Sequence, residues 1–203
     1  MSILTEKRRK VIIITDGDRV AGRTAQVAAK NIGARFISLT TGNPTPIEAP
    51  EVVNLIKQAP HDPVVILVDD RGECECGPGE EIIKYVAQHP DMEVIGAVAV
   101  ASNTSNTEGI KVNESITREG KIVKGPVDKL GHAEKQGHKY LEGDTVDILN
   151  QLHIPIIIGT GDTGKMDYAD ECFKGAPVTT KALQEIINRS EGLGTDSELF
   201  ESQ

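Results

Sequence analysis

Apolar runs and amphipathic segments alternate along most of the chain. Continuous runs rich in β-branched residues occupy Lys10–Thr15, Ala34–Leu39, Pro63–Asp70, Glu93–Ser102 and Ile154–Gly159. Such runs are typical of parallel strands that are buried on both faces. Five strand–helix units in succession predict an α/β fold, a Rossmann-like or flavodoxin-like three-layer sandwich whose mostly parallel five-stranded sheet lies between helices. The pattern leaves open whether the strand order is flavodoxin-like or another doubly wound order.

Short polar residues and one proline mark where the intervening helices should begin. Asp and Thr at such positions cap the free N–H groups of a first helical turn, and Pro suits the first position of a helix. The candidates are Asp16 or Asp18 for the first helix, Pro50 for a helix through Ala59, Asp144 for "GDTVDILNQL", and Thr179 or Thr180 for the last helix.

The alternation breaks between Asn103 and Leu141, where the chain is polar and rich in glycine. Val112–Thr117 and Lys121–Lys124 flank "REG" and predict a β-hairpin before the last strand. An irregular excursion of this size in a compact domain is more often functional than accidental. We expect a single domain over residues 1–192 and a frayed tail over residues 193–203.

Composition and charge exclude several function classes. The 203 residues suffice for one domain, whose core must be aliphatic because the chain has no Trp and only three Tyr and three Phe. The net charge of −9 argues against a general face for nucleic acid or anionic lipid, and we interpret the short basic stretch Glu6–Lys10 as a solvated flank. No apolar run is long enough for a transmembrane segment, and we expect no signal peptide. Three cysteines fit a reducing compartment better than a disulfide scaffold.

Acidic residues follow several of the predicted strands. Because ligands of open α/β sheets bind outside the carboxyl ends of the strands, these side chains are candidates for one site. Carboxylates at close range need a divalent cation, a proton or a lysine between them. The hypothetical metal ligands, for Ca²⁺ or Mg²⁺, are Asp16, Asp18, Asp69, Asp70 and Asp162, with Lys165 beside them.

Helix capping is the competing interpretation of the same carboxylates. An Asp after a parallel strand often caps the next helix, and for Asp16 and Asp18 this explanation is as good as membership of a site. Asp69 and Asp70 are harder to explain as caps, because no helix is predicted to begin within the next nine residues.

The stretch Gly159–Lys165 has the G-x-x-x-x-G-K spacing of a phosphate-binding P-loop. Met166 stands where a P-loop needs Ser or Thr for Mg²⁺, and no further strand follows that would carry a second acidic motif. A nucleotide-binding loop is therefore not the favoured interpretation.

Two motifs at the ends of the chain resemble those of haloacid-dehalogenase-like phosphohydrolases. They are "IIITDGDRV" and "IIIGTGDTGKMD". By this resemblance Asp16 is the nucleophile and Asp18 the general acid, while Asp162 and Asp167 help to hold Mg²⁺. The rim also resembles that of phosphoacceptor receiver domains, with Asp69 or Asp70 accepting and Lys165 bridging, although the long excursion does not fit that family.

Cys74 and Cys76 form a Cys-x-Cys pair that invites a metal interpretation. With only Cys172 left and no His nearby in sequence, the pair lacks the four ligands of a zinc site, so we interpret these residues as loop cysteines.

The order of motifs along the chain resembles that of the stage V sporulation protein AE family. The resemblance runs from about Lys10 to Gly192 and rests on "VIIITDGD", "ISLTTGNPTP", "DPVVILVDDRG", "GPVDKLG" and "HIPIIIGTGDTGKMD". The family implies sporulation and germination, with partners that form the inner-membrane channel for dipicolinic acid and its calcium chelate. It also implies a peripheral protein on the cytoplasmic side or surface of the spore inner membrane, held there by partner proteins and without an established cofactor or enzymatic activity.

Three hypotheses follow. The first is a non-enzymatic accessory protein of this channel whose acidic rim binds a divalent cation. The second is a Mg²⁺-dependent phosphohydrolase that uses Asp16, with Asp18 and Lys165 as the other catalytic candidates. The third is an adaptor whose excursion, Asn103–Leu141, binds a partner.

Overall fold

The computed structural model describes residues 7–72, 77–103, 107–135 and 137–200, the last eight of these by their backbone alone. The elements follow in the order β1 Arg9–Ile14, α1 Arg19–Asn31, β2 Arg35–Phe36, η1 Ser38–Thr40, α2 Ala49–Gln58, β3 Val64–Leu67, α3 Pro78–Gln88, β4 Met92–Val100, β5 Ile110–Lys111, β6 Glu114–Ile116, β7 Ile122–Lys124, β8 Tyr140–Leu141, η2 Asp147–Gln151, β9 Ile157–Thr160, η3 Cys172–Lys174 and α4 Pro177–Phe200, where η denotes a 3₁₀-helix.

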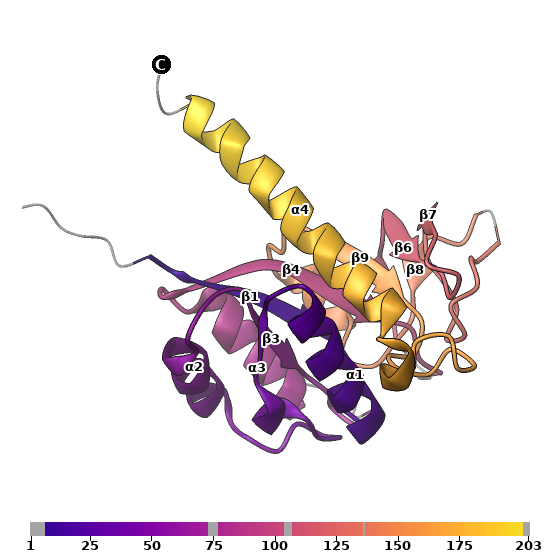
Figure 1. Cartoon of the computed structure of the whole chain (residues 1–203), viewed down its shortest axis with the longest axis horizontal. Coiled ribbons are helices and arrows are strands. Elements are labelled where there is room, and N and C mark those ends of the chain that lie inside the picture. Colours follow the sequence, from indigo (N-terminus) through magenta and orange to yellow (C-terminus); the bar gives the residue numbers. More distant parts are fainter. Residues whose placement is uncertain (1–6, 73–76, 104–106, 136, 201–203) are drawn as a thin grey trace, which may run out of the picture.

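A sheet of seven strands crosses the molecule in the order β2-β3-β1-β4-β9-β6-β7. Figure 1 labels all of these strands except β2. The first five strands of this order are the predicted parallel strands, and the α/β prediction is confirmed. In chain order these five lie as 2-3-1-4-5, which is not the flavodoxin-like order. The chain adds β2 and β3 on one side of β1 and then β4 and β9 on the other side, so the strand order switches between β1 and β4. A crevice is expected at the carboxyl ends of these two parallel strands.

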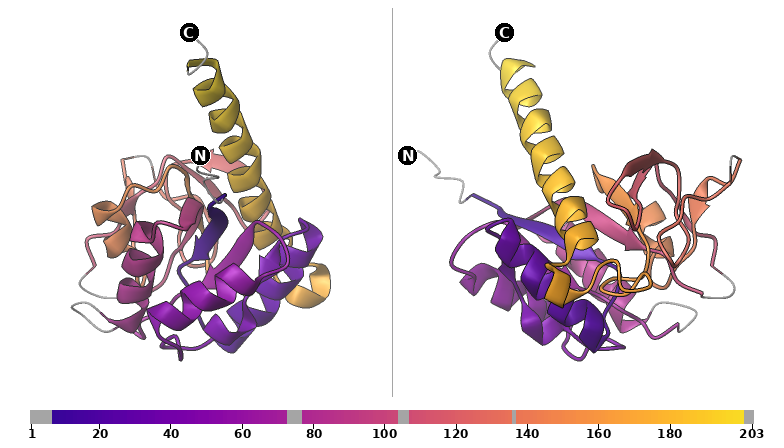
Figure 2. Two further views of the ribbon diagram at one scale, coloured as in Figure 1. Left: turned by 90° about the vertical axis from the view of Figure 1, so that its left-hand side faces the viewer. Right: turned by 45° about the vertical axis from the view of Figure 1, so that its right-hand side comes forward.

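Helices cover both faces of the sheet, as the alternation predicted (Figures 1 and 2). One face packs against α1 and α4, and the other packs against α2 and α3. Val11–Ile14 of β1 and all of β3 between them are completely buried, which explains their continuous apolar sequence. Gly96 of β4 permits the close approach of α4, because a Cβ there would lie 2.5 Å from Ile186.

The predicted hairpin is confirmed and extends the sheet. β6 pairs in parallel with β9 and antiparallel with β7, so the excursion adds two strands at one end of the sheet. β5 and β8 form a separate two-stranded sheet. The excursion is therefore packed against the domain through β9.

Three local predictions were wrong. "GDTVDILNQL" forms the 3₁₀-helix η2, and Asp144 does not cap it, because the carboxylate of Asp144 accepts from Gly72 N. The cap of α4 is neither Thr179 nor Thr180: the buried carboxylate of Asp170 accepts from Val178 N at 2.8 Å and from Thr179 N at 3.0 Å.

The last helix also runs further than the sequence suggested. It continues to Phe200, where we expected a tail from residue 193. The segment contains no proline to end a helix, and glycine weakens a helix without breaking it. The distal part of α4 projects from the body of the domain (Figures 1 and 2).

Candidate functional site

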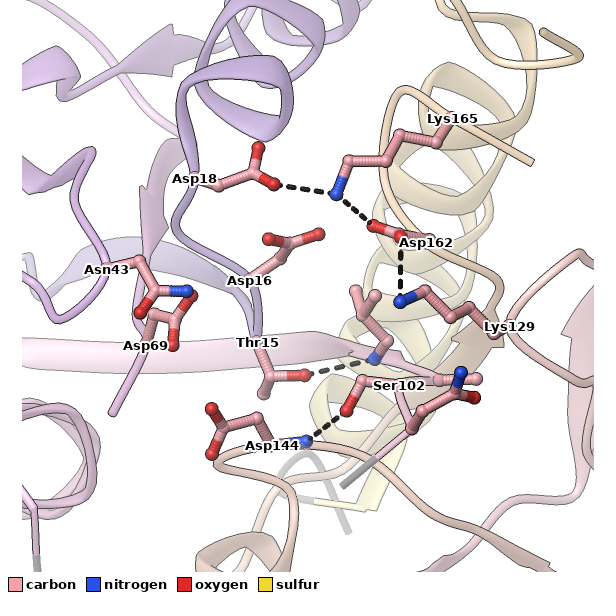
Figure 3. Close-up of a pocket in the computed structure, with 13 residues that line it drawn as sticks. Thr15, Asp16, Asp18, Asn43, Asp69, Ser102, Lys129, Asp144, Asp162 and Lys165 are labelled. Atoms are coloured by element: carbon pink, nitrogen blue, oxygen red, sulfur yellow. Dashed lines mark hydrogen bonds and ion pairs between the residues drawn. The ribbon is translucent and has the colours of Figure 1, made fainter. Parts of the chain in front are cut away.

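A polar pocket of about 240 Å³ lies in the crevice at the carboxyl ends of the central strands (Figure 3). It is lined by residues at or after the ends of β1, β2, β3, β4 and β9, together with Lys129 of the excursion and Asp144 of the segment after it. The lining residues are Thr15, Asp16, Asp18, Asn43, Asp69, Val100, Ala101, Ser102, Asn103, Lys129, Asp144, Asp162 and Lys165.

The loop after β1 is held close to the loops after β2 and β3. Gly17 makes this possible, because a Cβ at this position would lie 2.1 Å from the carbonyl oxygen of Gly42 and 2.4 Å from Cβ of Asp69. Thr15 ties the same loop to β4, since its hydroxyl accepts from Val100 N at 3.0 Å. The backbone therefore fixes the spacing between Asp16 and Asp69.

Lysines neutralise one side of the pocket. Lys165 Nζ donates to Asp18 Oδ2 at 2.6 Å and to Asp162 Oδ1 at 2.8 Å, and Lys129 Nζ lies 3.6 Å from Asp162 Oδ2 (Figure 3). Burial alone would raise the pKa of Asp18, but the bonds from Lys165 and from the first amides of α1 outweigh it and lower that pKa. Burial alone would lower the pKa of Lys165, but its two carboxylate partners raise it.

Asp16 occupies the centre of the pocket without such a partner. Its carboxylate accepts from Gly17 N at 2.7 Å and from Thr163 N at 3.3 Å. Burial, reinforced by the charges of Asp18 and Asp162, raises the pKa of Asp16 to about 7, although Lys165 opposes the shift. The environment of Asp16 therefore disfavours a bare negative charge.

Asp69 and Asp144 form a carboxyl pair on the other side of the pocket. Burial, together with the hydrogen-bonded neighbour Asp144, raises the pKa of Asp69 to about 6, although the amide of Arg71 opposes the shift. Asp144 is held by its own backbone, because its N–H donates to the Ser102 hydroxyl at 2.9 Å. Two carboxyl groups at this range share a proton or a cation.

The structure brings together most of the predicted site residues. Asp16, Asp18, Asp69, Asp162 and Lys165 all line the pocket.

Asp70 does not line this pocket. It is 1% exposed, and its carboxylate accepts from the amides of Gly79 and Glu80, so it caps α3 from a distance. Asp167 also lies outside, where it pairs with Arg118 at 3.2 Å.

The P-loop-like stretch binds carboxylates rather than presenting a phosphate cradle. Lys165 is committed to Asp18 and Asp162, and Met166 is buried in the core. Met166, Asp167 and Tyr168 all have positive φ values, between 49° and 67°, which is unusual for residues other than glycine. Cys74 and Cys76 lie outside the described residues.

Sequence reasoning missed Lys129 and Asp144. Lys129 lies in the excursion, where no periodicity indicated its direction, and it reaches the pocket because its carbonyl accepts from Asp162 N at 2.9 Å. Asp144 carried a signal, a "GD" pair before an apolar run, but that pattern is also the signature of a helix cap.

The side chains as they stand do not form a closed metal cage. Within the described ranges, no three His, Cys, Asp or Glu side chains are gathered closely enough to hold one metal ion. A cation that used Asp18 or Asp162 would have to displace the ammonium of Lys165, whereas Asp16, Asp69 and Asp144 have no lysine contact among the described residues.

Comparison with protein families gives one match. The family model of Stage V sporulation protein AE1 matches residues 10–190. The chain belongs to this family. The membership confirms the resemblance of the motifs and assigns the protein a sporulation-related role. No curated protein and no solved structure matches the chain significantly.

Among the described residues, no helix combines the length and the apolar character that crossing a membrane requires.

Proposed function

We propose that this sporulation protein is a non-enzymatic, peripheral accessory of the spore inner-membrane channel for dipicolinic acid, and that its pocket binds the divalent cation that accompanies this cargo. The family supplies the process. The cation-binding part of the proposal rests on the half of the pocket formed by Asp16, Asp69 and Asp144, whose carboxylates no lysine among the described residues neutralises.

The chemistry of this half suits calcium. Ca²⁺ takes six to eight oxygen ligands in flexible geometry, from carboxylates, amide carbonyls and water. The raised pKa values of Asp16 and Asp69 mark carboxyl groups whose charge is poorly compensated, and a divalent cation would compensate both. Asn43 on the same wall offers an amide oxygen.

We infer that partner proteins of the channel attach the protein to the membrane, on the cytoplasmic side of the spore inner membrane. The excursion next to the pocket is the surface we expect such partners to contact.

Calorimetric titration tests the cation. We expect Ca²⁺ to bind the wild-type protein, and the Asp16→Asn variant to bind it at least about tenfold more weakly, because a central ligand charge is lost. Asp91→Asn is the matched control, since Asp91 is an exposed carboxylate that pairs with Lys57 away from the pocket. The absence of any binding heat with millimolar Ca²⁺ or Mg²⁺ would remove the cation from the proposal.

Measurements on spores test the proposed role in dipicolinic acid uptake and release. Spores that lack the protein should contain less dipicolinic acid or release it more slowly, and the Asp16→Asn variant should restore this only in part. Normal content and release in the deletion strain would contradict the channel role.

A Mg²⁺-dependent phosphohydrolase is the second candidate. The adjacency of β1, β4 and β9 supports it, because it places Asp16 and Asp18 beside Asp162 and Lys165 as that chemistry would need. Two features weigh against it: Asp167 points away, and the surroundings of Asp16 disfavour the ionised carboxylate that a nucleophile requires. A phosphatase panel on wild type and Asp16→Asn decides, and equal background activity in both would eliminate this candidate.

A further inference from the structure

β7 is the outer edge of the seven-stranded sheet, and its pairing with β6 fixes which of its backbone groups face outward. Thr117 N donates to Lys121 O, and Gly125 N donates to Asn113 O, both at 2.9 Å. Within an antiparallel pair, alternate residues exchange these bonds with the partner strand. Lys121, Val123 and Gly125 therefore turn their backbone groups toward β6.

Ile122 and Lys124 turn their N–H and C=O groups the other way. No partner for these four groups exists among the described residues. The edge is also accessible, since the side chain of Ile122 is 42% exposed and that of Lys124 is exposed. An open edge of this kind is a template for another strand.

The charge around this edge differs from that of the rest of the protein. Residues 103–141 contain seven of the chain's 22 Lys and Arg and five of its 31 Asp and Glu, which gives +2. The remaining 15 basic and 26 acidic residues give −11. Lys124, the last residue of β7, and Lys121, which directly precedes this strand, are two exposed positive charges at the edge.

These charges select the occupant. Lysines on an edge strand discourage pairing with an identical strand, because two copies would bring like charges together. The same lysines attract a strand that carries carboxylates.

We propose that β7 is a docking strand, to which an acidic, extended segment of a partner protein adds as an eighth strand of the sheet. Main-chain bonds to Ile122 and Lys124 would give the affinity, and carboxylates beside Lys121 and Lys124 would give the specificity. This inference deepens the proposed attachment through partner proteins and does not depend on the cation pocket.

The experiment uses the full chain and a short synthetic peptide in which glutamate recurs at every third position among threonines. This spacing presents carboxylates on both faces of the sheet, because Lys121 and Lys124 are three residues apart and lie on opposite faces. Nuclear magnetic resonance should show that the peptide shifts the amide signals of β6 and β7 and slows hydrogen exchange at Ile122 and Lys124. A glutamine version should bind more weakly, and a version N-methylated along its bonding edge should not bind.

Matched variants distinguish binding at the edge of β7 from a general electrostatic attraction to the excursion. The reversal Lys121→Glu with Lys124→Glu should weaken peptide binding roughly tenfold, whereas Lys135→Glu with Lys139→Glu, exposed in the same excursion but off β7, should leave it within about twofold. Ile122→Pro removes an outward N–H without removing a bond to β6, so it should fold normally and lose the peptide.

Three results would overturn the proposal. Equal binding of the N-methylated peptide would show that charge alone acts. Binding to vesicles of anionic lipid that depends on Lys121 and Lys124, without peptide binding, would show a lipid surface instead. A concentration-dependent dimer that Ile122→Pro abolishes would show that the edge pairs with a second copy. Calcium calorimetry on the same variants stays unchanged in each case, which keeps the two proposals separate.

Discussion

The two acidic pairs that follow β1 and β3, Asp16 with Asp18 and Asp69 with Asp70, look alike in sequence. They differ in how pocket lining and helix capping are shared between the two carboxylates. Asp16 and Asp69 face the pocket, and both have raised pKa values. Asp18 and Asp70 each accept from the first amides of a helix, α1 and α3 respectively. Asp18 nevertheless lines the pocket and pairs with Lys165, whereas Asp70 is buried and only caps. Capping and membership of a site are thus not alternatives for one carboxylate.

The largest expected effect separates Asp70 from Asp69. Asp70→Ala removes the carboxylate that accepts from the buried amide of Gly79 and from the amide of Glu80, and we expect it to lower the free energy of unfolding by about 2–3 kcal/mol. Asp69→Asn keeps a polar group and relieves the contact with Asp144, so it should change stability by less than about 1 kcal/mol. Urea denaturation at neutral pH measures both, and equal losses would refute the division of roles.

The next effect concerns pH and Asp16. Its carboxyl has a pKa of 3.8 in the unfolded chain and about 7 in the fold, so the folded state holds a proton that the unfolded state has lost. Stability should therefore fall as the pH rises from about 4 to about 7 and then level off. Asp16→Asn removes this dependence, and we expect it to be more stable than wild type by about 2 kcal/mol above pH 7.

Thermal or urea denaturation across this pH range checks the curve. The pKa of Asp69 acts in the same direction between about 4 and 6, so the Asp16→Asn curve should retain a shallower slope there. Parallel curves for wild type and variant would show that Asp16 is ionised in the fold at all these pH values.

These roles explain what could be predicted from sequence. The α/β class and the hairpin followed from apolar period and turn chemistry, which are local signals. The capping role of Asp70 could not be predicted, because a loop separates Asp70 from the start of α3. A cap formed across a loop has no fixed spacing in sequence from the helix that it caps. Lys129 was missed for the same reason: only the contact between its carbonyl and Asp162 N, across the excursion, brings it to the pocket.

The ion pairs of Lys165 with Asp18 and Asp162 give the smallest expected effect on stability. They also give the sharpest test of whether a lysine takes the place of a cation on this side of the pocket. Lys165→Met removes two ion pairs from a side chain that is 40% exposed, so solvent screening limits the loss of stability to about 1 kcal/mol. Since the pKa of Lys165 is raised, this contribution is complete below its unfolded value of 10.5 and disappears only at strongly alkaline pH. Lys165 itself should therefore contribute equally from pH 6 to 9 in urea denaturation. The pKa of Asp16, which Lys165 lowers, should rise in the variant and move the fall in stability to higher pH. If the ammonium of Lys165 now serves as the cation for Asp18 and Asp162, its removal should also tighten Ca²⁺ binding in calorimetry.

Lys129→Met is the control, because Lys129 lies further from Asp162, at 3.6 Å, and should change both the stability and the Ca²⁺ affinity less. Weaker Ca²⁺ binding in Lys165→Met than in wild type would mean that the lysine supports the cation site rather than competing with it.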